Sequence, residues 1–275
     1  MPAVRSNKEI PMQLATWNVN SLKVRLPQVL AWLAENPVDV LCLQELKLEQ
    51  DKFPLAEVEA AGYRAAWLGQ KTYNGVAILV KAERSLDDVV TGIPGYDDVQ
   101  SRVIAATVDG VRVVCAYFVN GEAVDSPKYT YKLEWLAALE GYVERELERH
   151  AAFALLGDYN IAPEDIDVYD ADAWQGKVLC SAPERAAFGR LLALGLADAF
   201  RLFNREEKQY SWWDYRAMMF RRNLGLRIDH ILVSDALREH AVACVIDKLP
   251  RKWERPSDHT PVVLTLSAAA FAQDQ

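Results

Sequence analysis

The chain contains ten short, strand-like and mainly apolar runs of four to seven residues, and these runs constrain its fold more than any other feature. Runs of this length, rich in branched residues and bounded by polar residues or glycine, are typical of buried β-strands. The predicted strands are residues 12–17, 38–43, 63–68, 75–80, 102–108, 111–117, 153–156, 227–233, 241–246 and 262–266. Asp109 and Gly110 separate two of them and predict a tight hairpin. The chain is therefore expected to be built around β-sheets.

Three segments carry a helical pattern instead. The most regular is residues 129–149, in which one apolar stripe among charged residues predicts a helix packed on the core. That stripe consists of Leu133, Leu136, Val143 and Leu147. Shorter helices are predicted over residues 26–35, with Pro27 in the first turn, and over residues 184–194.

No linker, internal repeat or low-complexity tract divides the 275 residues, so residues 1–275 are expected to form a single domain. Flexible tails are expected at residues 1–11 and 267–275. The first eleven residues lack the apolar centre of a signal peptide, which predicts a cytoplasmic protein without a membrane partner. The four cysteines have no paired spacing and are expected to be reduced thiols in the core.

Polar residues gather where several predicted strands begin or end. Just ahead of residues 262–266, Asp258 and His259 are adjacent, so in an extended backbone their side chains point to different sides. Asp258 can then hold a divalent cation while His259 faces a substrate. Asp229, near the start of another predicted strand, is the natural orienting partner for His259.

Three further strand ends carry metal-site chemistry. Glu45 follows an apolar run without a turn residue, and carboxylate oxygen is the ligand type that magnesium prefers. Asn18 ends the first run and can bind a metal-held water or a phosphate oxygen. Asp158 and Asn160 follow residues 153–156, and a period of two places them on the same side of an extended strand.

Each of these residues also has an ordinary structural explanation. Aspartate and asparagine after a strand are common turn formers, and a lone histidine is usually a surface or satisfied core residue. We therefore expect His150, His230 and His240 to be surface or satisfied core residues. The coincidence of several strand ends with the right ligand types nevertheless favours a metal-assisted phosphodiester site over independent turns.

These residues stand in motifs whose order and spacing, over nearly the whole chain, resemble the exonuclease III and abasic-site endonuclease branch of the endonuclease/exonuclease/phosphatase superfamily. The motifs are WNVN at residues 17–20, LQELK at 43–47, GQKTYNGVA at 69–77, AYFVNGE at 116–122, LGDYNI at 156–161, GLRIDH at 225–230 and PSDH at 256–259. The resemblance implies an α/β fold that is a four-layer sandwich. Two mixed, mostly antiparallel β-sheets would pack face to face with helices outside.

The resemblance also implies a metal site. Glu45 would be the principal ligand of one or two Mg²⁺ ions, with Mn²⁺ as a plausible substitute. The full set of residues expected at the metal is Asn18, Glu45, Asp158, Asn160, Asp258 and His259.

Catalytic roles follow from the same resemblance. Asp158 would orient or deprotonate the attacking water, or protonate the leaving oxygen, and Asn160 would donate to the phosphate. His259, held by Asp229, would stabilise phosphoryl charge or act as the base. The hydroxyl of Tyr117 would reach the phosphate. Because no serine or cysteine nucleophile with a base is evident, direct attack by water is the simpler mechanism.

The charge balance bears on the substrate. A net charge of −8 argues against broad electrostatic binding, but residues 201–255 hold 12 lysines and arginines against 8 acidic residues. This segment is expected to contribute phosphate contacts from Arg216, Arg221, Arg222, Arg227, Lys248, Arg251 and Lys252. The opposite bank is expected to contribute Lys71, Arg102, Lys128 and Lys132. The amides of Asn120 and Asn223 are further substrate-binding candidates, although Asn120 stands where relatives carry a longer amide.

Aromatic residues refine the expected substrate. In relatives the position of Trp212 contacts the damaged nucleotide, and with Leu226 and Ile228 it can form an apolar pocket for a flipped-out abasic sugar. The expected partner is double-stranded DNA with an abasic site or a 3′ end, bound by a monomer. Val119, where a proline is frequent, and the loop at residues 166–177 depart from the family pattern and leave the balance of activities open. Two alternatives remain: a phosphatase acting on a non-nucleic-acid substrate, and a DNA-binding module that does not cut.

Overall fold

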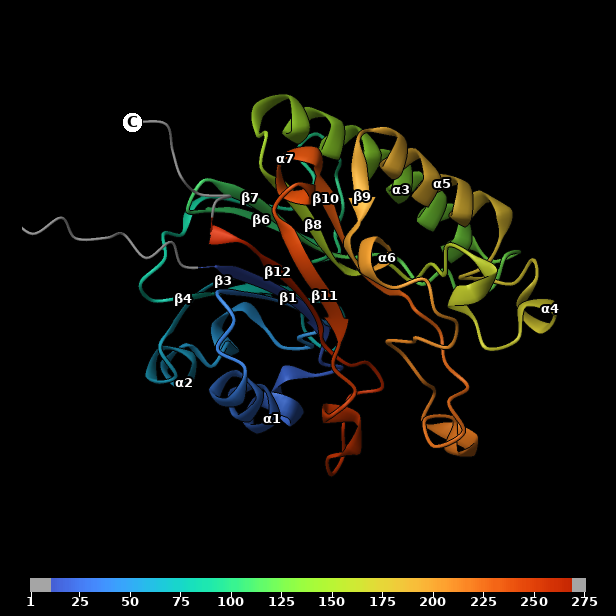
Figure 1. Ribbon diagram of the computed structural model, residues 1–275, viewed down its shortest axis with the longest axis horizontal. Helices are drawn as coiled ribbons and strands as arrows, with labels where there is room; N and C mark the ends of the chain where they lie inside the picture. Colours follow the sequence, from blue (N-terminus) through green and yellow to red (C-terminus); the bar gives the residue numbers. More distant parts are fainter. Residues whose placement is uncertain (1–10, 269–275) are drawn as a thin grey trace, which may run out of the picture.

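The computed structural model describes residues 11–268, which form two six-stranded β-sheets with helices around them (Figure 1). The first sheet contains, in spatial order, β11 (Ala241–Ile246), β12 (Val262–Leu266), β1 (Met12–Asn18), β2 (Val40–Gln44), β4 (Val76–Lys81) and β3 (Tyr63–Leu68). The second contains β5 (Asp87–Thr91), β6 (Val103–Val108), β7 (Val111–Tyr117), β8 (Phe153–Asp158), β10 (Asp229–Ser234) and β9 (Leu196–Asp198).

Both sheets are mixed and mostly antiparallel. In the first sheet β1 and β2 run parallel, and in the second β7 and β8 run parallel. The other pairings within the described residues are antiparallel. A parallel pair in each sheet places the carboxyl ends of both its strands at one edge, which is where the polar motifs stand.

Alternation along the central strands separates three apolar cores. Leu14 of β1 points into the core between the sheets, whereas its neighbour Ala15 packs on the opposite face. In β8, Leu156 enters the same central core and Leu155 enters the core beneath the outer helices. Strands buried on both faces read as continuous apolar runs, which explains why the sequence signal was strong.

Helices complete the outer layers. On the first sheet lie α1 (Leu22–Glu35) and α2 (Leu55–Ala60), and on the second lie α3 (Pro127–Arg149) and α5 (Ala182–Ala193) (Figure 1). The expected four-layer α/β sandwich is confirmed. Shorter helices are α4 (Ala171–Trp174), α6 (Ala199–Phe203), α7 (Asp235–Arg238) and the 3₁₀ turns η1 (Gln50–Lys52), η2 (Asp165–Asp167), η3 (Arg216–Met218) and η4 (Pro250–Lys252).

All three predicted helix starts are too late, and α3 begins two residues earlier than predicted, at Pro127. Helix α1 begins at Leu22, so Pro27 lies inside the helix and not in its first turn. The apolar stripe of Leu22, Val29 and Trp32 buries the helix on the sheet, and this burial outweighs the hydrogen bond that the proline removes. Helix α5 begins two residues earlier than predicted, at Ala182, because Ser181 provides an N-terminal cap.

All ten predicted strands are present: four have the predicted ends, and the ends of the other six move by at most two residues. Strands β5 and β9, which lie at the two edges of the second sheet, were not predicted. Residues of β5 are largely exposed and β9 has only three residues, so neither shows an apolar run. The predicted hairpin is confirmed, since Asp109 and Gly110 have φ values of 45° and 83° between paired Val108 and Val111.

The remaining expectations concern cysteines, tails and membranes. All four cysteines are free and buried, as expected. The expected tails lie almost wholly outside the described residues, although the backbone N–H of Ser267 donates to the carbonyl of His240 at 2.8 Å. Within residues 11–268, none of the helices combines the length and apolar character needed to cross a bilayer.

Candidate active site

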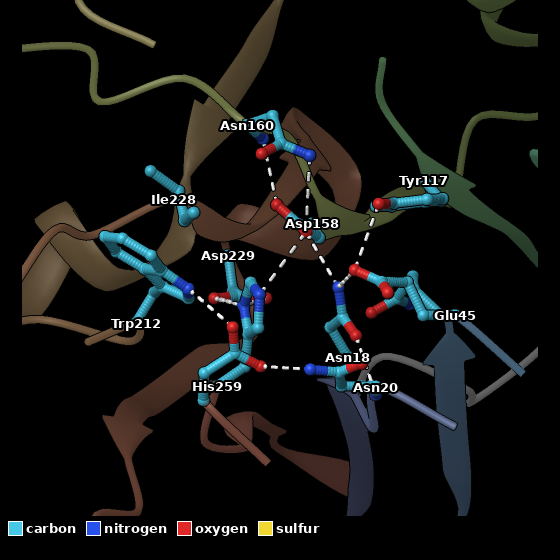
Figure 2. A network of polar contacts seen from close by, with 12 residues as sticks. Asn18, Asn20, Glu45, Tyr117, Asp158, Asn160, Trp212, Ile228, Asp229 and His259 are labelled. Carbon is cyan, nitrogen blue, oxygen red and sulfur yellow. Dashed lines mark hydrogen bonds and ion pairs between the residues drawn. The ribbon is translucent and has the colours of Figure 1, made fainter. Parts of the chain in front are cut away.

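The polar motifs meet at one edge of the sandwich because of strand direction (Figure 2). Asn18 and Glu45 follow the carboxyl ends of the parallel strands β1 and β2. Tyr117 and Asp158 end the parallel strands β7 and β8, where they are paired in register. Asp229 begins the antiparallel strand β10 directly opposite Asp158. The two sheets therefore deliver their polar ends to the same place.

An amide bridges the two carboxylates at the centre of this site. The side-chain nitrogen of Asn18 donates to Glu45 Oε1 at 2.8 Å and to Asp158 Oδ2 at 2.9 Å. The oxygen of the Asn18 amide accepts from the backbone of Asn20 at 3.0 Å, so it is turned away from the carboxylates. This differs from the expected binding of a cation through Asn18. The hydroxyl of Tyr117 also donates to Glu45 Oε1, at 3.0 Å.

His259 lies between two carboxylates. Its Nδ1 is 2.9 Å from Asp229 Oδ2, and its Nε2 is 3.6 Å from Asp158 Oδ2. Burial lowers the pKa of His259, but Asp229 and Asp158 outweigh burial and raise this pKa to about 10. The imidazole is therefore protonated at neutral pH and both ring nitrogens are donors. Nδ1 is engaged with Asp229, so Nε2 is the ring nitrogen that faces Asp158.

Burial has the opposite effect on Asp158. It raises the pKa of Asp158 to about 7, with His259 opposing the rise and Asp229 adding to it. Gly157 precedes Asp158 because β7 approaches closely there: a Cβ at Gly157 would lie 1.8 Å from the carbonyl oxygen of Ala116. The site thus places a carboxylate that changes charge near neutral pH beside an imidazolium that is still charged at that pH.

Asn160 reaches Asp158 by a turn and not by strand alternation. Strand β8 ends at Asp158, and Asn160 has a left-handed φ of 48°. Its backbone N–H donates to Asp158 Oδ1 at 2.9 Å, and its side chain donates to Asp158 Oδ2 at 3.3 Å. The amide oxygen of Asn160 accepts from Asn120 Nδ2 at 2.9 Å. The period-two argument was therefore wrong in its geometry, and the oxygen of Asn160 does not face a metal position.

The carboxylates of the site provide the oxygen ligands that a hard divalent cation prefers. Ligand atoms of Glu45, Asp158 and His259 lie within 4.8 Å of one another. With His259 protonated, Glu45 and Asp158 remain as oxygen donors, and magnesium typically takes one or two protein carboxylates and keeps several waters. Lys47 Nζ lies 2.8 Å from Glu45 Oε2 and balances part of this negative charge.

Asp258 lies outside that group. One of its oxygens accepts from Asn20 Nδ2 and the other from the indole N–H of Trp212, each at 3.0 Å. Burial raises the pKa of Asp258, but His259 and these hydrogen bonds outweigh burial and lower it. The carboxylate is therefore charged and already hydrogen-bonded at both oxygens, which is a different environment from the one expected for a metal ligand.

A cavity of about 1060 Å³ adjoins the site and is lined by Tyr117, Asn120 and the three cationic side chains Arg102, Lys128 and Arg216. Two acidic residues, Glu122 and Asp214, also line it, and Lys128 pairs with Glu122 at 3.1 Å. Arg102 is only 8 % exposed, and its guanidinium lies 4.9 Å from the centre of the Tyr117 ring. Lys71 does not line this cavity and pairs with Glu49 at 3.3 Å. The neutral lining residues Gln70, Tyr73, Asn74, Gln100 and Tyr131 were not predicted as site residues. Three of them, Gln70, Tyr73 and Asn74, stand in the GQKTYNGVA motif.

The expected apolar pocket is filled by the protein itself. Leu226 is 0 % exposed and Ile228 is 2 % exposed, so Leu226 offers no surface to a ligand and Ile228 almost none. The loop before α4 covers them, since Val168 pairs with Leu226 in an isolated antiparallel bridge. Trp212 is partly exposed and its ring centre lies 6.5 Å from that of His259. The prediction that Leu226 and Ile228 line an open pocket is wrong in this structure.

Several other expected contacts are also structural. Asn223 accepts from the indole N–H of Trp213 and donates to the carbonyl of Lys208, so both ends of its amide are used within the loop. Arg227 is buried and pairs with Asp167 and Asp198. Arg251 and Lys132 are buried as well. The side chains of Arg227, Arg251 and Lys132 therefore have no free surface with which to contact phosphates directly.

Two serines hold the site in place, and neither was predicted as a site residue. The hydroxyl of Ser257 donates to the backbone carbonyl of Asn18 at 2.7 Å and accepts from the backbone of His259. The hydroxyl of Ser211 accepts from the backbone N–H of Asp229 at 3.0 Å. Ser257 stands within the quoted PSDH motif, whereas nothing in the local sequence marks Ser211.

The chain matches known proteins along most of its length. Residues 15–259 match the model of the Endonuclease/Exonuclease/phosphatase family. The chain is 36% identical over 264 residues to exodeoxyribonuclease III of Haemophilus influenzae, covering 91% of this chain and 98% of that protein.

Two solved structures are similar in fold and sequence. The Neisseria 3′ phosphatase NExo, bound to a product DNA hairpin, is 54% identical with a TM-score of 0.91, covering 93% of this chain and 99% of NExo. An AP endonuclease from Archaeoglobus fulgidus is 38% identical with a TM-score of 0.88, covering 93% and 99% of the two chains. The chain therefore belongs to the endonuclease/exonuclease/phosphatase family.

Proposed function

We propose that this protein is a metal-dependent DNA-repair phosphodiesterase, using Mg²⁺ or Mn²⁺ to hydrolyse DNA at 3′ ends and abasic sites by direct water attack. The observation that carries the proposal is the meeting of Asp158, Glu45 and the His259–Asp229 pair beside a cavity with three cationic side chains. The names of the relatives, which are exonucleases, AP endonucleases and a 3′ phosphatase, support a DNA substrate.

In this proposal Asp158 is the general base. A group with a pKa of about 7 is largely ionised in mildly alkaline solution and still basic enough to take a proton from water. Asn18 and Asn160 hold both carboxylate oxygens of Asp158, so its orientation is set before the substrate binds.

His259 and Tyr117 complete the proposed charge stabilisation. His259, with a pKa of about 10, stays positively charged and stabilises negative charge on the phosphoryl oxygens. Burial raises the pKa of Tyr117 well above its usual range, so its hydroxyl remains a donor. Glu45 holds the divalent cation, with the Asp158 carboxylate beside it. The bound cation supplies further neutralisation of phosphate charge.

We further propose that residues 12–266 act as one domain. Asn18 and Glu45 come from the first sheet, whereas Asp158 and Asp229 come from the second. The hydrogen bond between Asn18 and Asp158 joins the two sets. Neither sheet alone carries a complete site.

The filled apolar pocket refines the proposed substrate. A flipped-out abasic sugar needs free space beside Trp212, and Val168 and Leu226 occupy that region. A 3′-terminal group does not have to be extruded from an intact duplex and needs no such pocket. We therefore propose that the protein favours blocked or recessed 3′ ends over internal abasic sites.

Cleavage of end-labelled duplexes tests this proposal. The duplexes carry a 3′-phosphate, a recessed undamaged 3′ end or an internal abasic analogue, each assayed with magnesium or EDTA, with soluble inositol phosphates as a separate arm. We expect metal-dependent reaction at the 3′ ends, at least about tenfold faster than at the abasic analogue. Faster cutting at the abasic analogue would contradict the 3′-end preference. Hydrolysis of inositol phosphates without cleavage of DNA would refute the DNA substrate.

The two shifted pKa values predict a bell-shaped pH profile for kcat/KM. Activity should rise as Asp158 loses its proton, near or below pH 7 because a bound cation favours the carboxylate, and fall as His259 loses its proton near pH 10. In Asp229→Asn the carboxylate that raises the pKa of His259 is gone, so the alkaline limb should move toward 6.5, the ordinary histidine value. Initial rates between pH 5 and about pH 11 measure both limbs. An alkaline limb that does not move in Asp229→Asn would remove His259 from this role.

A further inference from the structure

A buried lysine ammonium lies behind the proposed site and not within it. Lys132 of α3 is 0 % exposed. Its Nζ donates to the backbone carbonyl of Asn160 at 2.7 Å, to that of Asn120 at 3.2 Å, and to the carboxylate of Glu184. An ammonium has three N–H donors, and all three are used here. Lys132 therefore fixes two loop backbones and one helix terminus from a single point.

The two loops that Lys132 holds carry an amide pair directed at Asp158. Asn120 Nδ2 donates to Asn160 Oδ1 at 2.9 Å, and Asn160 Nδ2 lies 3.3 Å from Asp158 Oδ2. Asn120 also lines the cavity beside the site. A shift of either carbonyl would therefore change the direction of the amides that orient Asp158 and face the cavity.

The position of the ammonium is itself fixed. Glu184 accepts from the backbone N–H of Leu179 at 2.9 Å and of Ser181 at 3.0 Å, so its carboxylate cannot follow a moving lysine. On the other side, a Cβ at Gly121 would lie 3.1 Å from Lys132 Cδ and 3.2 Å from Val178 Cγ2. Gly121 has a φ of 92°, so this close approach of loop backbone to the lysine stem depends on glycine.

Stability alone does not explain a charge at this position. Burial lowers the pKa of Lys132, with Glu184 opposing the decrease, so holding the charge here has a free-energy cost. Replacing a buried ion pair with apolar residues is often neutral or stabilising. Glu146 of α3 forms a second buried ion pair with Arg112 of β7, whose side chain otherwise bonds only to Asp88 and Thr107 among the described residues. This second pair offers a control in which another buried cation is paired with a glutamate.

We propose that Lys132 is a positioning residue that sets the Asn120–Asn160 amide pair against Asp158, an inference that rests on the function proposed above. Lys132 does not touch substrate. Its loss should lower kcat because the amides and Asp158 lose their alignment, while the cationic cavity wall and therefore KM stay nearly unchanged. A misplacement on the order of 1 Å can cost about 10²-fold in rate.

The test compares Lys132→Met with Arg112→Met, using the duplex that the wild-type protein cleaves fastest. Both variants are assayed at a temperature where circular dichroism shows them folded. We expect Lys132→Met to lower kcat by about 10²-fold with KM within about twofold of wild type. Arg112→Met should keep kcat within about twofold. Equal kcat losses in the two variants, or a normal kcat in Lys132→Met, would overturn the proposal.

A double variant separates positioning from folding. Lys132→Met leaves Glu184 buried without its cation, whereas Lys132→Met with Glu184→Gln removes that unpaired charge. We expect the double variant to regain thermal stability while kcat stays low. Recovery of kcat together with stability would show that Lys132 only supports folding.

A readout independent of activity completes the test. In ¹H–¹⁵N spectra the side-chain NH₂ signals of Asn120 and Asn160 should shift in Lys132→Met and not in Arg112→Met. If wild-type protein cleaved no duplex, the proposed function would fail, and these signals would still decide whether Lys132 orients the amides. Unshifted signals would refute the positioning role in either case.

Discussion

Replacing Asp158 with asparagine is expected to lower kcat for the preferred duplex by about 10³-fold, in the range of general-base catalysis. Asparagine keeps the shape of the side chain but cannot accept a proton from water. KM should change by less than about threefold, because the substitution removes an interaction made in the transition state and not uniform binding. Steady-state kinetics at saturating magnesium give both constants.

The control for this result is Asp214→Asn, the same chemical change in the wall of the adjoining cavity. Asp214 caps the backbone of Arg216 at 2.8 Å and has no hydrogen bond to the proposed catalytic groups. We expect its kcat to stay within about twofold of wild type. If Asp158→Asn retained more than about a tenth of wild-type kcat, another residue would have to be the base.

Asp158→Asn should also make stability less dependent on pH. The folded-state pKa of Asp158 is raised from 3.8 to about 7, so the folded protein holds this proton more tightly than the unfolded chain. The resulting penalty on folding begins as pH rises through 3.8 and is complete above about 7. Asparagine carries no charge and escapes this pH-dependent penalty, while its amide nitrogen replaces one of the two oxygens that accept from Asn18 and Asn160. Denaturant unfolding should therefore show a smaller fall in the free energy of unfolding between about pH 4 and about pH 8 in Asp158→Asn than in wild type.

The second large effect is expected at Glu45. Glu45→Gln should lower kcat by at least about 10²-fold at limiting magnesium, because the stabilisation that a bound cation supplies is worth several kcal/mol. Glu45 Oε1 accepts from Asn18 and Tyr117, and glutamine can keep these two bonds through its amide oxygen. What it loses is the negative charge that balances a divalent cation and Lys47.

Magnesium titration measures this effect. We expect the magnesium concentration for half-maximal activity to rise by at least about tenfold in Glu45→Gln, and EDTA to abolish activity in both proteins. Glu49→Gln is the control, since Glu49 is a nearby acid that pairs with exposed Lys71 outside the cavity. An unchanged magnesium requirement in Glu45→Gln would place the cation elsewhere.

The expected pH profile and the expected effects of Asp158→Asn share one electrostatic cause. Asp158 and His259 are buried side by side, 3.6 Å apart, and the surroundings move both pKa values upward from their ordinary ranges. One group then changes charge near neutral pH and the other stays positive. Environments that give two neighbouring groups different protonation states are a common basis for dividing acid and base roles in enzymes.

Much of the fold was predictable because burial on both faces makes central strands visible. Residues 153–156 and 262–264 are continuous apolar runs, and both lie in strands in the structure. The exposed edge strand β5 and the three-residue β9 lack this signal. The start of α1 was misplaced because Pro27 was taken as a boundary, whereas packing of Trp32 and Val29 on the sheet stabilises a longer helix.

The residue types of the site were predictable, but the orientations of their side chains were not. Strand ends carry Asn18, Asp158 and Asp229, and their residue types alone indicated metal and acid–base chemistry. The sequence did not reveal that Asn18 turns its nitrogen to both carboxylates, or that Asn160 reaches Asp158 through a left-handed turn. These orientations depend on hydrogen bonds between segments far apart in the chain.

Periodicity and residue type are local properties, so the sequence predicted ten of the twelve strands within residues 11–268, the helices α1, α3 and α5, and the set of chemical groups at the site. Which of these groups meet, and which are buried, depends on contacts between distant segments and therefore on the tertiary structure. Lys132, Arg227 and Leu226 read as surface or pocket residues, yet each is covered by elements distant in sequence. Burial also sets the charge state of Asp158 and His259, since the cost of ionisation depends on water excluded by the whole fold.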